Sequence, residues 1–141
     1  MKEASWQDCV ETRSSIKITP DKQKASSLIE TAKERIKYTN KEINENNINF
    51  VFEDYYSSIL ELIHAIVIIN GYNVKNHVCL GFYIKDILKR KDLFIVFDDC
   101  RYKRNSLTYY GRKMDFATAK QTIIKCKILI KELKSIIKKT D

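Results

Sequence analysis

The chain has 141 residues, of which 44% are hydrophobic and 31% charged, and its formal net charge is +8. This composition excludes a disordered chain, and the length supports one domain with an ordinary core. Only three glycines and one proline are present, which disfavours folds built from strands and turns and predicts an all-α protein. The positive charge suits RNA or another polyanion as a partner, or reflects only a sequence rich in Lys, Ile and Asn.

The N-terminal residues 1–19 are weakly patterned and predict an arm or a short helix, docked through Trp6. From residue 20 onward, apolar residues recur every three to four positions. This spacing predicts an antiparallel up-and-down bundle of about five helices with short loops. The chain is therefore divided into the segment 1–19 and a helical domain at 20–141.

The expected helices are bounded by recognisable end signals. They span residues 21–44, 50–70, 76–88, 92–111 and 115 onward. Candidate N-caps are Asn76, Asp92 and Asp115, while Gly71 and Gly111 suit the left-handed conformation that ends a helix. The last helix has the cleanest period, with apolar residues at steps of 3, 4, 3, 4, 3 and 4. These residues are Phe116, Ala119, Ile123, Cys126, Ile130, Leu133 and Ile137.

The four cysteines are widely separated and have neither CxxC nor Cys-His zinc spacing. Three lie at apolar positions of expected helices, so we expect reduced thiols and a cytoplasmic location. The longest apolar run, 59–69, is too short to span a bilayer, and the first residues lack the apolar core of a signal peptide. No membrane partner, metal or cofactor is expected.

The second helix is apolar nearly all round in its second half, which is typical of the centre of a bundle. Glu61 must find solvent or a cation there. The two histidines are interpreted as structural: His64 as a hydrogen-bonded core residue, and His77 as a surface residue in the first turn of its helix.

Arg104 falls on an inward-facing stripe of the helix 92–111. Because a guanidinium stays protonated, we predict that Arg104 is largely buried, either paired with an acid such as Glu61 or in a subunit contact that handles anions. The stripe is formed by Phe94, Phe97, Cys100, Leu107 and Tyr110 or Gly111.

A polar face of the same helix could recognise phosphate. It combines two guanidiniums with an amide, a hydroxyl and phenols, contributed by Arg101, Arg104, Asn105, Thr108, Tyr109 and Tyr110. The alternative is that Asp98 and Asp99 pair with Arg101 and Lys103 as ordinary solvent-side ion pairs.

Two further groups of basic residues are candidates for contact with nucleic acid, or are simply solvated. One is the connector Lys89-Arg90-Lys91. The other is a row along the last helix, formed by Lys120, Lys127 and Lys134.

The run Asp98-Asp-Cys-Arg101-Tyr-Lys-Arg104-Asn105-Ser-Leu-Thr-Tyr109-Tyr110-Gly111 resembles the motif helix of HEPN domains, the higher eukaryote and prokaryote nucleotide-binding helical bundles. It is similar to small archaeal and bacterial members with an Arg-x-x-Arg-Asn-x-x-x-Tyr-Tyr-Gly helix. Upstream, Pro20-Asp-Lys-Gln-Lys-Ala25, Asp54-Tyr-Tyr56, Glu61-Leu and Gly71-Tyr72 look like the same group.

The resemblance implies metal-independent RNA cleavage in a cleft between two subunits, by attack of a ribose 2′-hydroxyl on the adjacent phosphate. The family motif is Arg, four to six residues, then His. Arg104 matches the arginine and Asn105 its polar neighbour, whereas Tyr109 stands in the place of the histidine. A tyrosine is a poor general base near neutral pH, so the departure predicts RNA or nucleotide binding with slow or absent cleavage.

Three interpretations follow. The first is a non-catalytic HEPN protein that binds RNA or a nucleotide, as the partner of a nucleotidyltransferase in toxin–antitoxin fashion. The second is an active ribonuclease, and the third is a structural dimer in which Arg104 merely pairs with Glu61. We also expect a homodimer whose two motif helices face each other.

Overall fold

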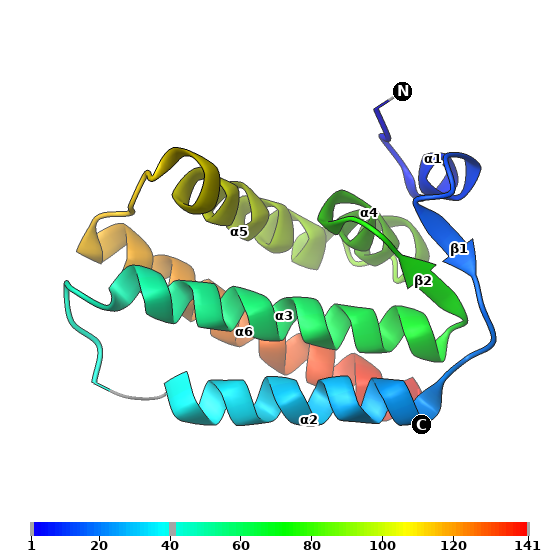
Figure 1. The fold of residues 1–141 in the computed structure, drawn as a ribbon, viewed down its shortest axis with the longest axis horizontal. Coiled ribbons are helices and arrows are strands. Elements are labelled where there is room, and N and C mark those ends of the chain that lie inside the picture. The colour runs from blue at the N-terminus through cyan, green and yellow to red at the C-terminus, as the bar shows by residue number, and fades with distance from the viewer. Residues whose placement is uncertain (1, 40–41, 141) are drawn as a thin grey trace.

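A computed structural model describes residues 2–39 and 42–140. These residues form six α-helices, one π-helical turn and a two-stranded sheet, arranged as a helical bundle (Figure 1). The predicted all-α fold is confirmed. In chain order the elements are α1 (Trp6–Glu11), β1 (Ser15–Lys17), α2 (Lys22–Thr39), α3 (Ile48–Ile69), β2 (Tyr72–Val74), α4 (His77–Phe82), the π-helical η1 (Tyr83–Ile87), α5 (Lys91–Tyr110) and α6 (Phe116–Thr140).

Among the described residues, no helix combines the length and the hydropathy needed to cross a bilayer.

Several helix ends follow the local sequence signals. The side chains of Asn76 and Asp115 accept hydrogen bonds from the amides of Cys79 and Thr118, which caps α4 and α6. Gly71 and Gly111 have φ values of +84° and +63° and end α3 and α5.

Two expected boundaries are wrong. Helix α2 ends at Thr39 rather than at residue 44, where residues 44–47 form a turn held by asparagine side chains. Residues 40 and 41, which were expected to belong to this helix, lie outside the described residues. Asp92 does not cap α5, which begins at Lys91, because its carboxylate instead binds the Arg90 guanidinium.

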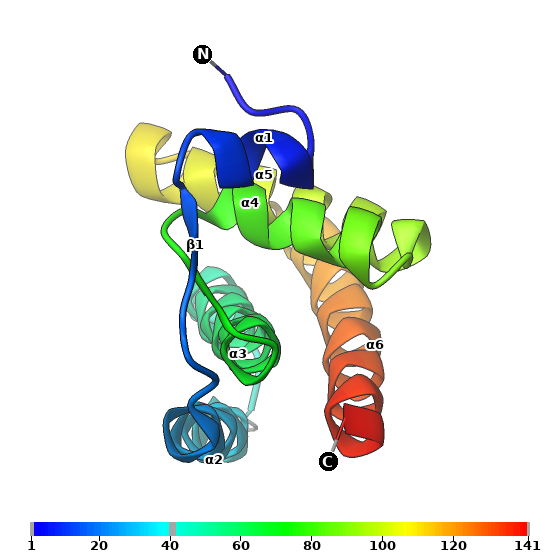
Figure 2. The same ribbon diagram turned by 90° about the vertical axis from the view of Figure 1, so that its right-hand side faces the viewer.

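Helix α3 is the centre of the bundle, as its apolar sequence predicts. It lies along α2 and is also packed against α4, α5 and α6 (Figures 1 and 2). Its fully buried side chains include Phe52, Ile59, Leu62, Ile63 and Ile66. Burial of each such side chain stabilises the fold by about 1.5–3 kcal/mol, so α3 supplies much of the core. The heptad pattern of α6 is also confirmed, since all of its positions but the half-buried Phe116 are buried.

The N-terminal segment is docked through Trp6, as predicted. The buried indole packs edge-on against Tyr72 and Tyr83, with ring centres 5.2 and 5.0 Å apart. The segment also pairs β1 with β2 in antiparallel register, Ser15 opposite Val74. Strands of three residues are too short to show an alternating pattern, which is why the sequence did not predict them.

The expectation that all four cysteines are reduced is wrong for one pair. Cys9 and Cys79 form a disulfide with Cα atoms 5.9 Å apart, which ties α1 to α4. The pairing of β1 with β2 brings these two residues together across 70 positions of sequence. Cys100 and Cys126 are buried free thiols with sulfurs 3.7 Å apart. The cytoplasmic expectation therefore loses the support it drew from reduced cysteines.

Candidate functional site

Arg104 lies half-buried at the edge of the core, between α5 and α3. Its guanidinium carbon is 6.0 Å from the centre of the Tyr56 ring, within the range of a cation–π interaction. Among the described residues, Arg104 has no carboxylate within 4.0 Å and forms no side-chain hydrogen bond. A half-buried guanidinium with this environment is available to an anion that comes from outside the chain.

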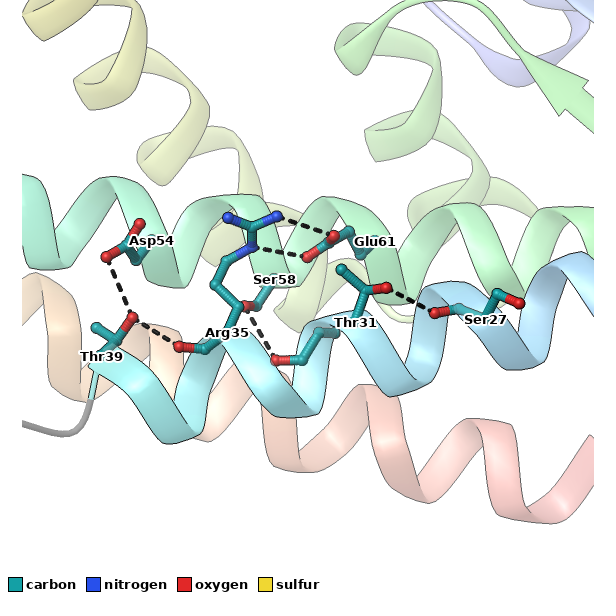
Figure 3. A network of polar contacts seen from close by, with 8 residues as sticks. Ser27, Thr31, Arg35, Thr39, Asp54, Ser58 and Glu61 are labelled. Atoms are coloured by element: carbon teal, nitrogen blue, oxygen red, sulfur yellow. Dashed lines mark hydrogen bonds and ion pairs between the residues drawn. The ribbon is translucent and has the colours of Figure 1, made fainter.

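The predicted pair of Arg104 with Glu61 is wrong, because Glu61 binds Arg35 instead. The Arg35 Nε and Nη2 donate to the two carboxylate oxygens at 3.0 and 3.1 Å (Figure 3). Glu61 lies on the side of α3 that packs against α2, whereas Tyr56 and Arg104 meet on another side. The third interpretation, in which the pair Arg104–Glu61 gives the arginine a purely structural role, loses its premise.

Tyr56 and His77 form the second part of the site. The Tyr56 hydroxyl and His77 Nδ1 are 3.2 Å apart, and the tautomer decides which of them donates. The Tyr56 ring is buried and stacked on Phe97 of α5, with ring centres 6.0 Å apart. Helices α3, α4 and α5 thus meet at Tyr56, with an imidazole on one side of it and a guanidinium on another.

Burial and nearby positive charge set the protonation states at the site. The pKa of His77 is lowered by burial and, in addition, by Arg104, His64 and Arg101. The pKa of Tyr56 is raised well above its usual value by burial, which outweighs the opposing influence of the two arginines. Near neutral pH the imidazole is therefore neutral and the phenol keeps its proton.

Gly81 allows α4 to approach α5 closely. A Cβ atom at this position would lie 3.2–3.3 Å from ring carbons of Phe97 and Phe94. A larger residue would require the Phe94 or Phe97 ring to move by a few tenths of an ångström. The small residue therefore suits the close packing of α4 against α5.

The acidic neighbours on α5 neutralise part of the predicted phosphate-binding face. Asp98 binds the Arg101 guanidinium at 2.9 Å, and Asp99 binds Lys103 at 2.8 Å. The alternative interpretation of these residues as ion pairs is confirmed. Of the basic residues on this stretch of α5, Arg104 is the one left without a carboxylate partner.

Asn105 and Tyr110 belong to a different surface. They line a hollow of about 410 Å³ together with Tyr102, Ser106 and Arg112. The expectation that Tyr110 or Gly111 faces inward is wrong, since the Tyr110 side chain is 73% exposed and Gly111 is also exposed. Tyr110 follows Arg104 by six residues, which turns it roughly 120° away from the buried stripe.

The remaining motif residues are also exposed. Tyr109 is 69% exposed, and a separation of five residues turns it roughly 140° from Arg104 around the helix axis. Thr108 is exposed as well. Within one chain, Tyr109 does not stand where an imidazole would share a phosphate with Arg104.

The connector 89–91 and the lysine row on α6 differ in the groups that their charged side chains contact. In the connector, Arg90 is engaged by Asp92 at 3.0 Å and by Glu132 at 3.6 Å, while Lys89 and Lys91 are exposed. In the row on α6, the Lys127 ammonium lies 5.8 Å from the centre of the Tyr55 ring, and the Lys120 ammonium lies over Phe116.

A groove between α2 and α6 has a basic wall. It has a volume of about 530 Å³ and is lined by Ile36, Tyr55, Lys127, Lys131, Lys134 and Lys138, among others. All four lysines belong to α6, whereas Arg104 belongs to α5.

Comparison with known proteins returned no matching family model, no matching curated protein and no matching solved structure.

Tyr56 was not predicted as a site residue from the sequence, and His77 was interpreted as an ordinary surface residue. Tyr56 was part of the Asp54-Tyr-Tyr56 run in the family resemblance, which was the only available signal. His77 carried none, because 27 positions separate it from Arg104. Only the packing of α4 against α5 brings the two residues to the same site.

Proposed function

We propose that this protein is a HEPN-type helical bundle that binds RNA or a nucleotide through a phosphate group at Arg104. The observation that carries the proposal is the half-buried Arg104 guanidinium, which has no carboxylate within 4.0 Å among the described residues. A phosphate would supply the missing negative charge and accept two parallel hydrogen bonds from the guanidinium. The resemblance of the sequence 98–111 to the HEPN motif helix supports the same ligand class.

The surroundings of Arg104 suit an anion. His77 is neutral near pH 7 and can donate a hydrogen bond to a phosphate oxygen, while Tyr56 holds the imidazole in place. The net charge of +8 adds a long-range attraction for polyanions. RNA as the ligand would also agree with a cytoplasmic protein.

An exposed stripe on α5 supports a homodimer as the proposed assembly. Ile95, Tyr102 and Tyr109 recur at intervals of seven residues and are 58%, 66% and 69% exposed. A stripe of this kind can pack against its own copy around a two-fold axis. The two motif helices would then lie side by side. Because Tyr109 is turned roughly 140° from Arg104 around the helix axis, each Arg104 site would face away from this contact and remain open to its own ligand. In the wider proposal the protein is one component of a toxin–antitoxin-type pair with a nucleotidyltransferase.

Fluorescence anisotropy with a labelled single-stranded RNA tests the phosphate site. Arg104→Ala is compared with Arg112→Ala, which removes the same charge from an exposed arginine beside Tyr110. We expect Arg104→Ala to weaken binding about tenfold or more, as the loss of a charge-assisted pair requires. Arg112→Ala should change affinity only through the loss of non-specific electrostatic attraction, which depends on the salt concentration. Equal losses for both variants would reject a specific site at Arg104.

A further inference from the structure

We propose that the groove between α2 and α6 is a docking site for an acidic amphipathic helix of a partner protein. The proposal goes beyond the RNA or nucleotide site at Arg104, because other residues form the groove. Helices α2 and α6 both pack on α3 (Figure 2), and the groove lies between them. A partner helix in this position would lie opposite α3 and extend the bundle by one helix.

The groove is long enough to hold several turns of a helix. It consists of two hollows of about 530 and 590 Å³. The hollows are contiguous, because Lys134 and Lys138 line both of them. At 1.5 Å per residue, the stretch of α6 from Lys127 to Lys138 covers roughly 16 Å, or about three turns.

Both helices contribute apolar side chains to the groove. On each of them two isoleucines seven residues apart reach it, a spacing that keeps the two on one face. The two isoleucines of α2 are half-buried, so part of their surface is open to a partner. Aliphatic side chains at the same seven-residue spacing on a partner helix would pack against them. The isoleucines are Ile29 and Ile36 of α2 and Ile130 and Ile137 of α6.

The groove is also strongly positive. Its two hollows are lined by five lysines and by one acid, Glu30. Among residues 2–39 and 42–140, none of these lysines has a carboxylate within 4.0 Å. Lys134 is half-buried, so its ammonium would gain from a carboxylate supplied by a partner. The lysines are Lys33 of α2 and Lys127, Lys131, Lys134 and Lys138 of α6.

The apolar and the charged side chains together select the occupant. A helix with a row of aliphatic side chains flanked by glutamates or aspartates matches both. A second copy of the same groove does not match, because the lysines of the two copies would repel one another. RNA matches only the charge, since the aromatic side chain in the lining, Tyr55, is 2% exposed and offers no face on which a base could stack.

Exposed apolar residues of α6 continue the surface beyond the lysines. Ile124 and Ile128 are 49% and 57% exposed. Around the helix axis they lie roughly 20° and 60° from Lys131. A partner that reaches over this side of α6 would cover both isoleucines and extend the apolar contact.

A designed peptide tests the proposal on the full-length protein. It has three heptads with leucine at positions a and d, glutamate at e and g, and a fluorescent label. The like charges at e and g keep the peptide from pairing with itself. Two control peptides change one property each: one replaces leucine by serine, and the other replaces glutamate by glutamine. By anisotropy at low salt, we expect a Kd of about 10 μM for the acidic peptide and binding at least about tenfold weaker for either control.

Variants of the protein locate the binding site. Lys131→Glu with Lys134→Glu reverses two charges of the groove, and Lys125→Glu with Lys139→Glu makes the same change elsewhere on α6. Lys125 and Lys139 are exposed, line neither hollow, and are turned roughly 140° and 180° from Ile130. Both double variants have the same net charge, so they separate local contact from general attraction. We expect the first to weaken peptide binding about tenfold or more, and the second less than about threefold.

Arg104→Ala separates this proposal from the proposed function. The variant should leave peptide affinity unchanged, because Arg104 lines neither hollow. Loss of RNA binding in this variant with retained peptide binding is the expected combination. A peptide affinity that falls with Arg104→Ala as much as with the groove variant would reject the groove as the docking site.

The remaining outcomes decide the class of partner. Equal losses in the two double variants, or equal binding of the serine peptide, would reject helix docking and leave only general attraction. Absence of peptide binding at low salt would overturn the proposal, and RNA binding that depends on Lys131 and Lys134 would then assign the groove to nucleic acid. Circular dichroism and thermal unfolding show whether each variant is folded. If Lys134→Glu is not, Lys131→Glu with Lys138→Glu replaces it, because both side chains are exposed.

Discussion

Arg35 and Glu61 join α2 to α3 through two hydrogen bonds of 3.0 and 3.1 Å. The pair leaves Arg104 without the acid that was expected to be its partner. The same interface contains the hydrogen bond of Thr39 to Asp54 and that of Ser58 to the backbone oxygen of Ala32. The acid on the central helix therefore serves the structure, while the arginine on α5 remains open to a ligand.

Glu61→Gln should destabilise the protein modestly. The side chains of Arg35 and Glu61 are 37% and 15% exposed, so solvent screens much of their attraction. We expect a loss of about 1 kcal/mol in the free energy of unfolding, measured by urea denaturation. Glu53→Gln is the control, because Glu53 is half-buried on the same helix and forms no ion pair with any described residue. Equal losses in both variants would contradict a stabilising role for the pair.

Arg104→Ala should leave stability almost unchanged. A buried ion pair would cost 3–5 kcal/mol on loss of one partner, but Arg104 has only a cation–π contact with Tyr56. That contact contributes about 1 kcal/mol or less at a half-exposed position. Thermal unfolding of the variant and the wild type in the same buffer checks this. A loss above about 2 kcal/mol would indicate a structural role that the observed contacts do not explain.

The fold could be predicted from the sequence wherever residues within a helix, or next to it, indicate where that helix ends and which of its faces is buried. Asn76, Asp115, Gly71 and Gly111 act within a few residues of where they stand, so local chemistry was enough. The pairing of β1 with β2 and the disulfide between Cys9 and Cys79 depend on contacts across more than 50 positions. No local pattern indicates such contacts.

The site was predictable only in part for the same reason. Helical periodicity placed Arg104 on an apolar stripe, and its half-burial is consistent with that position. Periodicity cannot say which helix covers each face, so it assigned Glu61 to the wrong arginine and did not connect His77 with Tyr56. A linear motif also does not show direction around the helix. Five residues after Arg104, Tyr109 is turned roughly 140° around the axis of α5, which is why it is exposed.

The disulfide should be detectable by a thiol count. In the denatured, unreduced protein, two of the four cysteines should react with a thiol reagent, because Cys100 and Cys126 are free. Reduction should release the other two and lower stability by roughly 4 kcal/mol, since the bond closes a long loop in the unfolded chain. A Cys9→Ala and Cys79→Ala double variant should not respond to reductant. Four reactive thiols before reduction would contradict the pairing.

The two histidines should make stability depend on pH below neutrality. Both have a pKa lowered by burial, His77 further by Arg104 and His64 further by Lys24. Above the ordinary histidine pKa of about 6.5, folded and unfolded chains both carry neutral imidazoles and stability does not change on their account. Below it the unfolded chain binds protons that the folded chain does not, so the free energy of unfolding should fall with decreasing pH.

Urea denaturation between pH 7.5 and 5.5 measures this effect in a range where most carboxylates stay ionised. Each histidine can contribute a slope of at most about 1.4 kcal/mol per pH unit. The slope should decrease in His77→Gln and in His64→Gln, and more in the double variant, because glutamine binds no proton in either state. Phosphate or a 2′-deoxy oligonucleotide should also reduce the part due to His77, since a bound anion offsets Arg104 and Arg101 and brings the folded pKa back toward 6.5. A slope that both single variants leave at the wild-type value would show that burial does not hold these imidazoles neutral.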